Sequence, residues 1–344
     1  MLCKAGERGH RCCPQIAPFT TVQVNHTAIH LLTVAHFCAS SFPVVSSRRC
    51  TRAANYLTLQ QFPQRFLMAA RDVILHAGKG LQCPVFDETE QLHVLSFANG
   101  GILVQAEEGD DEAVAEVHNT GGQPSGLAFQ GGQAFVADQA HAAILALDGD
   151  GEHSTVVNEY EGKAFKGPHS IVFDTAGVMY FTDSGPLGET SLQHPAGSVF
   201  TVGTDELLRP VAHECLAHPS GLALAPGDAA LYVCETLANR LVRFVQKPQG
   251  VYHMSVFHQF SGRLGPLAVA CDHQRGGLLY VARFDFEHCA EEGCISVLSP
   301  EGAHIRDITV GGAEVSGLAI SPDGQELLVT DAANNTLTRV PLAE

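Results

Sequence analysis

Tryptophan is absent from this sequence of 344 residues, and only 17% of the residues are charged. A helical bundle needs more charged positions on its outer faces, whereas few charges and 34 glycines are typical of a turn-rich β protein. An apolar content of 45% excludes disorder over the whole chain. The eleven cysteines include no CxxC pair, which argues against a zinc knuckle or a thioredoxin motif. Their odd number and irregular spacing indicate reduced thiols.

Acidic residues are nearly missing from the first 67 residues, which hold seven bases and only Glu7 as an acid. This segment is therefore +6, and the net charge of −17 leaves −23 on residues 68–344. An acidic body repels phosphate groups, so we expect neither nucleic acid nor a membrane surface as a partner. We expect a protein partner or a small-molecule ligand instead.

The basic extension, residues 1–67, has three interpretations. Its Arg- and Ser-rich, acid-poor composition resembles a presequence, which would place the protein in mitochondria. Alternatively it is a disordered tail, or Met68 is the true start and the upstream residues belong to an over-extended gene model; either case predicts a cytoplasmic protein. The most apolar stretch, 28–47, contains two histidines and a proline and is a poor membrane span.

One phrase recurs through the rest of the chain, for example as QPSGLAF at 123–129 and HPSGLAL at 218–224. The copies are 40, 44, 51, 47 and 49 residues apart, a period typical of four-stranded propeller blades and similar to NHL-like repeats. Two further strand-like phrases follow each copy, such as MYFTD at 179–183. The anchor positions of the six copies are Pro84, Pro124, Pro168, Pro219, Pro266 and Val315.

The sequence therefore predicts an all-β domain over residues 70–344, a six-bladed β-propeller with four-stranded blades. The last copy lacks a fourth strand, while residues 71–76 read as a strand before the first copy. We expect this N-terminal strand to join the last blade and close the ring, because closure removes an exposed edge. An acid ends the second strand in four copies, and we predict that it accepts backbone N–H bonds from neighbouring turns. These acids are Asp138, Asp183, Glu235 and Asp331.

The phrases at 167–185 and 218–244 resemble the senescence-marker-protein/gluconolactonase/LRE-like family and its strictosidine-synthase-like relatives, in the calcium-dependent phosphotriesterase superfamily. The resemblance covers residues 70–344. It implies a six-bladed propeller and an ancestry of hydrolases that act on lactone or ester bonds.

In that family a divalent cation, usually calcium, lies in the central channel, with ligands from the innermost strands. The resemblance places Gln82, His169, Ser220 and Leu267 where the family has Glu, Asn, Asn and Asp. Because calcium affinity depends on carboxylate ligands, the resemblance implies a degenerate metal site. The alternative is a weak or altered divalent-metal site, in which His169 and Cys83 would hold a softer ion.

His169 is the candidate catalytic residue, as a general base towards a serine or a water. The alternative is a hydrogen-bonded histidine that fills a polar channel. We expect six side chains at equivalent places in their repeats to line this channel. They are Gln82, Ser125, His169, Ser220, Leu267 and Ser316.

Two functions follow from these residues. The first is a binding or scaffold propeller with a degenerate metal site and without catalysis, and the loss of both acidic positions supports it. The second is a lactone or ester hydrolase with a remodelled centre that uses His169. Fold alone does not decide between them.

Overall fold

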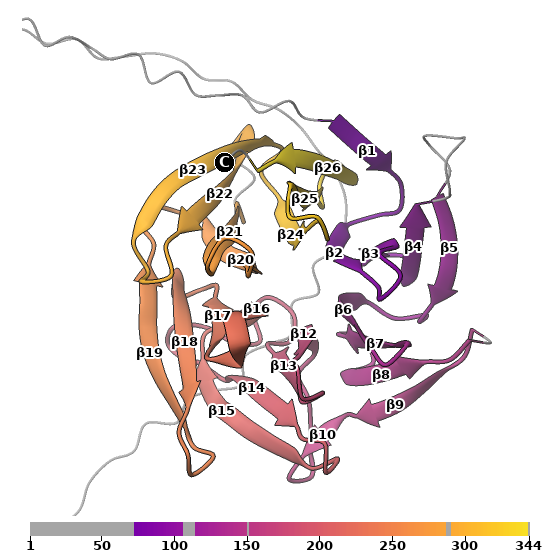
Figure 1. The fold of residues 1–344 in the computed structure, drawn as a ribbon. Coiled ribbons are helices and arrows are strands. Elements are labelled where there is room, and N and C mark those ends of the chain that lie inside the picture. The colour runs from indigo at the N-terminus through magenta and orange to yellow at the C-terminus, as the bar shows by residue number, and fades with distance from the viewer. Residues whose placement is uncertain (1–71, 106–113, 150, 287–289, 343–344) are drawn as a thin grey trace, which may run out of the picture. The chain divides into compact units, whose positions relative to one another are not determined.

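The computed structural model describes residues 72–105, 114–149, 151–286 and 290–342. The basic extension, residues 1–67, lies outside these described residues. Six four-stranded antiparallel sheets follow one another along the chain. Figure 1 shows them arranged as blades around a central axis, with the colour advancing from indigo to yellow around the ring. The predicted six-bladed β-propeller is thus confirmed.

In each blade, the strands are named in order from the one nearest the channel to the one at the outside of the ring. Blade 1 consists of β2 (Leu81–Phe86), β3 (Leu92–Ser96), β4 (Gly101–Gln105) and β5 (Val114–Asn119). Blade 2 consists of β6 (Pro124–Gln130), β7 (Gln133–Asp138), β8 (Ala143–Leu147) and β9 (His153–Val157). Blade 3 consists of β12 (Pro168–Phe173), β13 (Met179–Asp183), β14 (Gly197–Val202) and β15 (Leu208–Leu216).

Blade 4 consists of β16 (Pro219–Leu224), β17 (Leu231–Glu235), β18 (Arg240–Gln246) and β19 (Tyr252–Gln259). Blade 5 consists of β20 (Gly265–Asp272), β21 (Leu278–Phe284), β22 (Glu292–Leu298) and β23 (His304–Gly311). Blade 6 consists of β24 (Val315–Ile320), β25 (Glu326–Asp331), β26 (Thr336–Pro341) and β1 (Asp72–His76).

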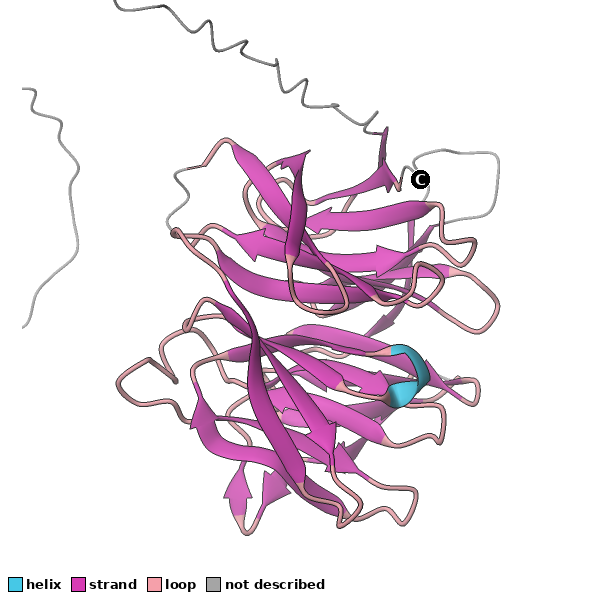
Figure 2. Ribbon diagram, turned by 60° about the vertical axis from the view of Figure 1, so that its left-hand side comes forward, coloured by secondary structure: helices cyan, strands magenta, loops and turns pink. Residues whose placement is uncertain are grey.

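The ring closes as the sequence predicts. Strand β1 pairs antiparallel with β26, with Val73 opposite Thr338, so the N-terminal strand supplies the outer strand of the last blade. A minor hairpin of β10 (Glu159–Tyr160) and β11 (Lys163–Ala164) precedes blade 3. Among the described residues the helical content is one short 3₁₀ turn, η1 (Pro226–Asp228), drawn in cyan in Figure 2. No helix in the described ranges is long and apolar enough to cross a membrane.

The hydrophobic core consists of six clusters, each between two neighbouring blades. In the cluster between blades 2 and 3, for example, Ile144 of β8 packs with Phe181 and Phe200 of blade 3. The inner strands contribute to these clusters on both faces, because successive side chains of a strand point to opposite sides. Each blade is therefore held mainly by its two neighbours.

The acids that end the second strands have the predicted structural role. The Asp138 carboxylate accepts the backbone N–H groups of Gln123 and Ala140, each at 3.0 Å. The Asp183 carboxylate accepts the N–H of Gly167 at 2.8 Å. These bonds fix the turn that leads into each inner strand, and so they set the position of the residues that follow it at the channel.

Candidate functional site

In blades 2, 3, 4 and 6 the anchor is the first residue of the inner strand and faces the last residue of the second strand; in blade 5 the anchor Pro266 is the second residue of β20 and faces Arg283. Pro124 pairs with Asp138, Pro168 with Asp183 and Pro219 with Glu235. The residue that follows the anchor therefore lies at one common level in every blade. These six residues are Gln82, Ser125, His169, Ser220, Leu267 and Ser316.

The prediction that Pro84 is the anchor of blade 1 is wrong. Leu81 pairs with Ser96, the last residue of β3, so Leu81 occupies the anchor position and Pro84 lies three residues further along β2. The proline is a misleading marker here, because ladder hydrogen bonds rather than residue type define register. With this register, Gln82 falls at the level of the other five residues.

The three serines at this level bind the neighbouring blade. The hydroxyl of Ser125 lies 3.0 Å from the carbonyl oxygen of Pro168, and that of Ser220 lies 2.9 Å from the carbonyl oxygen of Leu267. The Ser316 hydroxyl donates to the carbonyl oxygen of Leu81 at 2.5 Å. Carbonyl oxygens of the same blade lie farther away, at 3.2 Å from the hydroxyls of Ser125 and Ser316, so the single proton of each hydroxyl is assigned to the next blade. We call these bonds stitching bonds; they join blades 2 to 3, 4 to 5 and 6 to 1.

Glycine follows each of these serines, because the next blade is too close for a side chain. A Cβ atom on Gly221 would lie 2.6 Å from the Cα of Ala268, and one on Gly126 would lie 2.8 Å from the Cα of Ser170. A Cβ atom on Gly317 would lie 2.5 Å from the backbone nitrogen of Cys83. The Ser-Gly pair is therefore a packing device of blades 2, 4 and 6.

Blades 1, 3 and 5 carry other residues at the same level. The Gln82 side-chain amide donates to the carbonyl oxygen of Pro124 at 3.1 Å, so its nitrogen is also used between blades. Blade 3 makes its bond to blade 4 through Thr182, whose hydroxyl donates to the carbonyl oxygen of Ser220 at 2.8 Å. This leaves His169 without a stitching role. Leu267 has no polar side-chain atom to offer.

His169 is buried, with 9% of its surface exposed, and its Nδ1 atom has no hydrogen-bond partner in the described structure. The ring of His218, also buried, lies edge-on to it with a centroid distance of 6.1 Å. Burial, and secondarily the neighbouring His218, lower the pKa of His169 to about 3. Burial lowers the pKa of His218 to about 4. Both imidazoles are therefore neutral at pH 7.

A cavity of about 550 Å³ extends along the inner strands of all six blades. At one end of the cavity the lining residues are Ser125, His169, Leu267 and Ser316. Gln82 and Ser220, at the same level, do not line it. A ring of apolar side chains, one from each blade, surrounds it at the next level, two residues further along each strand. This ring consists of Pro84, Leu127, Ile171, Leu222, Val269 and Leu318.

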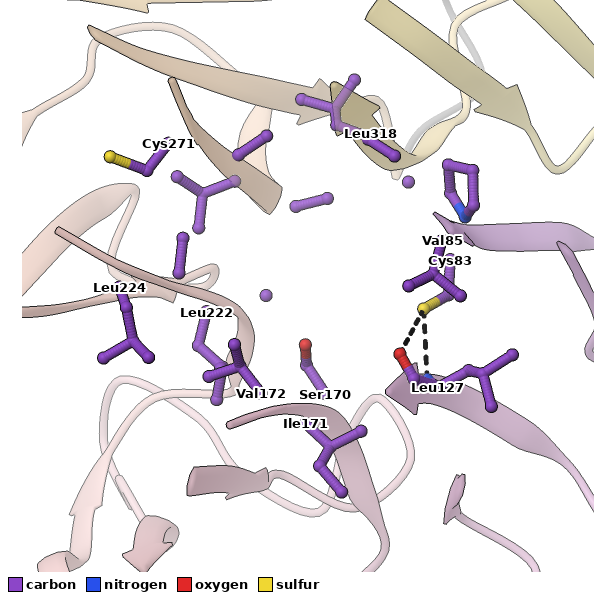
Figure 3. A pocket seen from close by; sticks show the side chains of 18 of the residues that line it. Cys83, Val85, Leu127, Ser170, Ile171, Val172, Leu222, Leu224, Cys271 and Leu318 are labelled. Atoms are coloured by element: carbon purple, nitrogen blue, oxygen red, sulfur yellow. Dashed lines mark hydrogen bonds between the residues drawn. The ribbon is translucent and has the colours of Figure 1, made fainter. Parts of the chain in front are cut away.

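Ser170 is a cavity residue that the sequence did not single out. Figure 3 shows its hydroxyl pointing toward the open centre of the channel, among the apolar side chains of Ile171, Val172 and Leu222. Its backbone N–H is bound by Thr182. A signal was present in the repeat, because blades 2, 4 and 6 have glycine where blade 3 has Ser170.

The opposite limit of the cavity is acidic. Asp174 and Asp228 line it there, on the turns that follow the inner strands of blades 3 and 4. Both the backbone N–H and the hydroxyl of Thr175 donate to the Asp228 carboxylate, at 3.0 and 2.5 Å, which ties the two turns together. None of the described residues that line the cavity is a Lys or an Arg.

The residues at the family's calcium positions do not fit that ion. Calcium requires six to eight oxygen ligands, several of them carboxylates. Here the Ser220 hydroxyl donates to a carbonyl and is fully buried, Leu267 is apolar, and His169 offers nitrogen. In residues 72–105, 114–149, 151–286 and 290–342, no three His, Cys, Asp or Glu side chains converge as ligands. Cys83, the proposed soft partner of His169, instead contacts the backbone of Leu127 through its sulfur, and burial raises its pKa to about 11.

Comparison with known proteins places the chain in a family. Residues 82–333 match the model of the SMP-30/gluconolactonase/LRE-like region. The gluconolactonase of Zymomonas mobilis is 36% identical over 109 residues, which is 30% of each chain. The strictosidine synthase-like 6 protein of Arabidopsis thaliana is 31% identical over 148 residues, which is 40% of each chain. The alignments thus span less than half the length of these two curated relatives.

Solved structures share the fold over most of its length. The gluconolactonase XC5397 of Xanthomonas campestris has a TM-score of 0.68 at 22% identity, covering 81% of this chain and 91% of that one. The calcium-binding protein regucalcin of Agrobacterium tumefaciens has a TM-score of 0.62 at 19% identity, covering 78% and 94%. With the family model matched over nearly the whole propeller, this chain belongs to the SMP-30/gluconolactonase/LRE-like family.

Proposed function

We propose that this chain is a binding propeller of its family and does not carry out calcium-dependent hydrolysis of lactones or esters. One observation carries the proposal: the level of the channel where the family holds its cation has no carboxylate, and most of its polar groups are committed to bonds between blades. Gln82 and the three serines donate to carbonyl oxygens of the next blade. These groups are parts of the scaffold rather than free ligands.

The missing charge decides against calcium. Affinity for this ion rises with the number of carboxylate ligands, and a site without any has nothing to offset the loss of the ion's water shell. The apolar ring directly below this level would add no ligand. A reaction that needs the ion as a Lewis acid therefore has no support from these side chains.

A hydrolase centred on His169 is the second candidate, because its Nδ1 atom is free and the residue lines the cavity. An effective general base has a pKa near the working pH, and burial holds that of His169 far below it. The serines at its level donate to backbone carbonyls, so none is poised as a nucleophile. The geometry therefore favours binding over catalysis.

The test is hydrolysis of a panel of lactones and aryl esters by the full chain, with calcium, manganese, zinc or a chelator. We expect no turnover above the uncatalysed rate. A double variant, Gln82→Glu with Leu267→Asp, serves as the matched control, because it restores the two acids that the resemblance places there. We expect calcium binding, measured by calorimetry, in the double variant and not in the original chain.

Metal-dependent turnover by the original chain that disappears in His169→Ala would overturn the proposal and establish the second candidate. Both proteins must show the same thermal unfolding midpoint for this comparison, because a misfolded variant loses activity for unrelated reasons. A scaffold role would be supported further by isolation of the chain in an assembly of fixed stoichiometry.

A further inference from the structure

We infer that the channel cavity binds an apolar small molecule that carries a hydrogen-bonding group and no negative charge. This inference rests on the proposed function, since it names the kind of ligand that a binding propeller would take. It starts from the size of the cavity: about 550 Å³ is within the range of small-molecule sites, which run from about 300 to 1,000 Å³.

The side chains of the wall are mainly apolar and favour an apolar ligand body. The six residues of the apolar ring surround the cavity, and small half-buried alanines such as Ala268 and Ala270 line it between them. A polyhydroxylated ligand would lose its hydrogen bonds to water in this region and find polar backbone groups but few polar side chains to replace them, at a cost for each unpaired group. A sugar lactone is therefore a poor fit, whereas a hydrocarbon or aromatic body buries its surface favourably.

One polar side chain points into the cavity between the apolar ring and the anchor level. It is the Ser170 hydroxyl, which points into the open centre, whereas the neighbouring His169 lines the cavity with its Nδ1 atom buried. A hydroxyl both donates and accepts hydrogen bonds. One hydrogen-bonding group on the ligand, a donor or an acceptor, would therefore be satisfied by the Ser170 hydroxyl.

The charge of the cavity excludes anions. Asp174 and Asp228 line its far limit, and no Lys or Arg of its described lining offers a counter-charge. Residues 68–344 carry a net charge of −23, so the field of the whole domain has the same sign. A carboxylate would approach two fixed negative charges in a partly desolvated channel, where like charges repel most strongly.

The experiment measures the binding of four compounds to the full chain. Three share the same phenylbutyl body and differ in their polar group: 4-phenylbutanol, 4-phenylbutylamine and 4-phenylbutyrate. The fourth is glucono-δ-lactone. Isothermal calorimetry should detect the alcohol and the amine, with the carboxylate at least about tenfold weaker and the lactone undetected. Ala270→Phe fills the cavity and should weaken the alcohol and the amine at least about tenfold. Ala115→Phe, on exposed strand β5, is the matched control and should leave both affinities unchanged.

A second variant keeps the inference testable if Ala270→Phe does not fold. Asp228→Asn should narrow the preference for the amine over the carboxylate severalfold, while Asp205→Asn, at an exposed position paired with Arg209, should not. Binding of the carboxylate or the lactone as tightly as the alcohol would overturn the inference, and so would failure of all three phenyl compounds to bind. Those outcomes leave the proposed function standing, since only turnover in the hydrolysis assay overturns it.

Discussion

Alternate blades use the same position of the inner strand for different purposes. Blades 2, 4 and 6 have a Ser-Gly pair there, and in each the serine hydroxyl binds the next blade while the glycine lets that blade approach. Blades 1, 3 and 5 have other residues at this position, and mainly their backbone atoms receive the close contact from the glycines. The ring therefore has an approximate threefold alternation imposed on six similar repeats.

The difference between the two kinds of blade indicates which channel residues can be replaced without loss of packing. A Ser-Gly blade loses packing if its residues change, because a buried carbonyl and a close backbone contact depend on them. A blade of the other kind has more freedom, and Gln82, His169 and Leu267, three of the four positions that depart from the family pattern, are all on such blades. Ser220 is the exception, because it lies on a Ser-Gly blade; its hydroxyl binds blade 5, as the Gln82 amide binds blade 2.

The largest effect is expected from adding a side chain at a Ser-Gly blade. Gly221→Val would place Cβ 2.6 Å from both the Cα of Ala268 and the carbonyl oxygen of Leu267, backbone atoms that cannot move alone. We expect a loss of about 3 kcal/mol or more in the free energy of unfolding, at the upper end of the cost of overpacking. Urea unfolding monitored by circular dichroism measures it.

The matched change in the other kind of blade is Ala268→Val, at the equivalent position of blade 5, where the side chain borders the cavity. Ala268 is half-buried and also packs against the core cluster between blades 5 and 6, but no neighbouring backbone limits it as it limits Gly221, so we expect a change of about 1 kcal/mol or less. Equal losses from the two substitutions would contradict the alternation.

A smaller effect is expected from removing one hydroxyl. Ser220→Ala deprives the buried carbonyl of Leu267 of its 2.9 Å hydrogen bond, and an unsatisfied buried acceptor costs about 1–3 kcal/mol. Ser170→Ala removes a hydroxyl that points into the cavity, and we expect a change within about 0.5 kcal/mol. The two midpoints of thermal unfolding should therefore separate, and a larger loss for Ser170→Ala would reverse the roles assigned to the two serines.

The repeat in the sequence was enough for the fold, because strand periodicity and turn residues are local and the blade period is regular. It also predicted the closing strand, since an incomplete last copy leaves only one partner for residues 72–76. The stitching bonds of Ser125, Ser220 and Ser316 could not be predicted, because their acceptors lie in another blade. Pro84 misled for a different reason: blade 1 has a proline at the level of the apolar ring and Leu81 at the anchor, so residue type alone indicated the wrong register.

The smallest effect is a pH dependence that belongs to the blade 3 histidine. In the unfolded chain the pKa of His169 returns to its ordinary value of 6.5, whereas burial holds it at about 3 in the folded protein. Between these values the unfolded state binds more protons, so the contribution is complete above pH 6.5 and is lost as the pH falls toward 3. The slope is at most about 1.4 kcal/mol per pH unit, which gives about 1 kcal/mol between pH 6.5 and 5.5.

Urea unfolding of the original chain and of His169→Gln at these two pH values isolates this contribution. Stability should fall more steeply with acid in the original chain, by about 1 kcal/mol over the interval, whatever the offset that the substitution itself causes at pH 7. His253→Gln removes an exposed histidine of β19 and should leave the slope unchanged. If His169→Gln had the same slope as the original chain, His169 would have to be accessible to protons in the folded state. An imidazole that takes up protons in the folded state would have a pKa near that of a working general base. The hydrolase centred on His169 would then be favoured over the binding propeller.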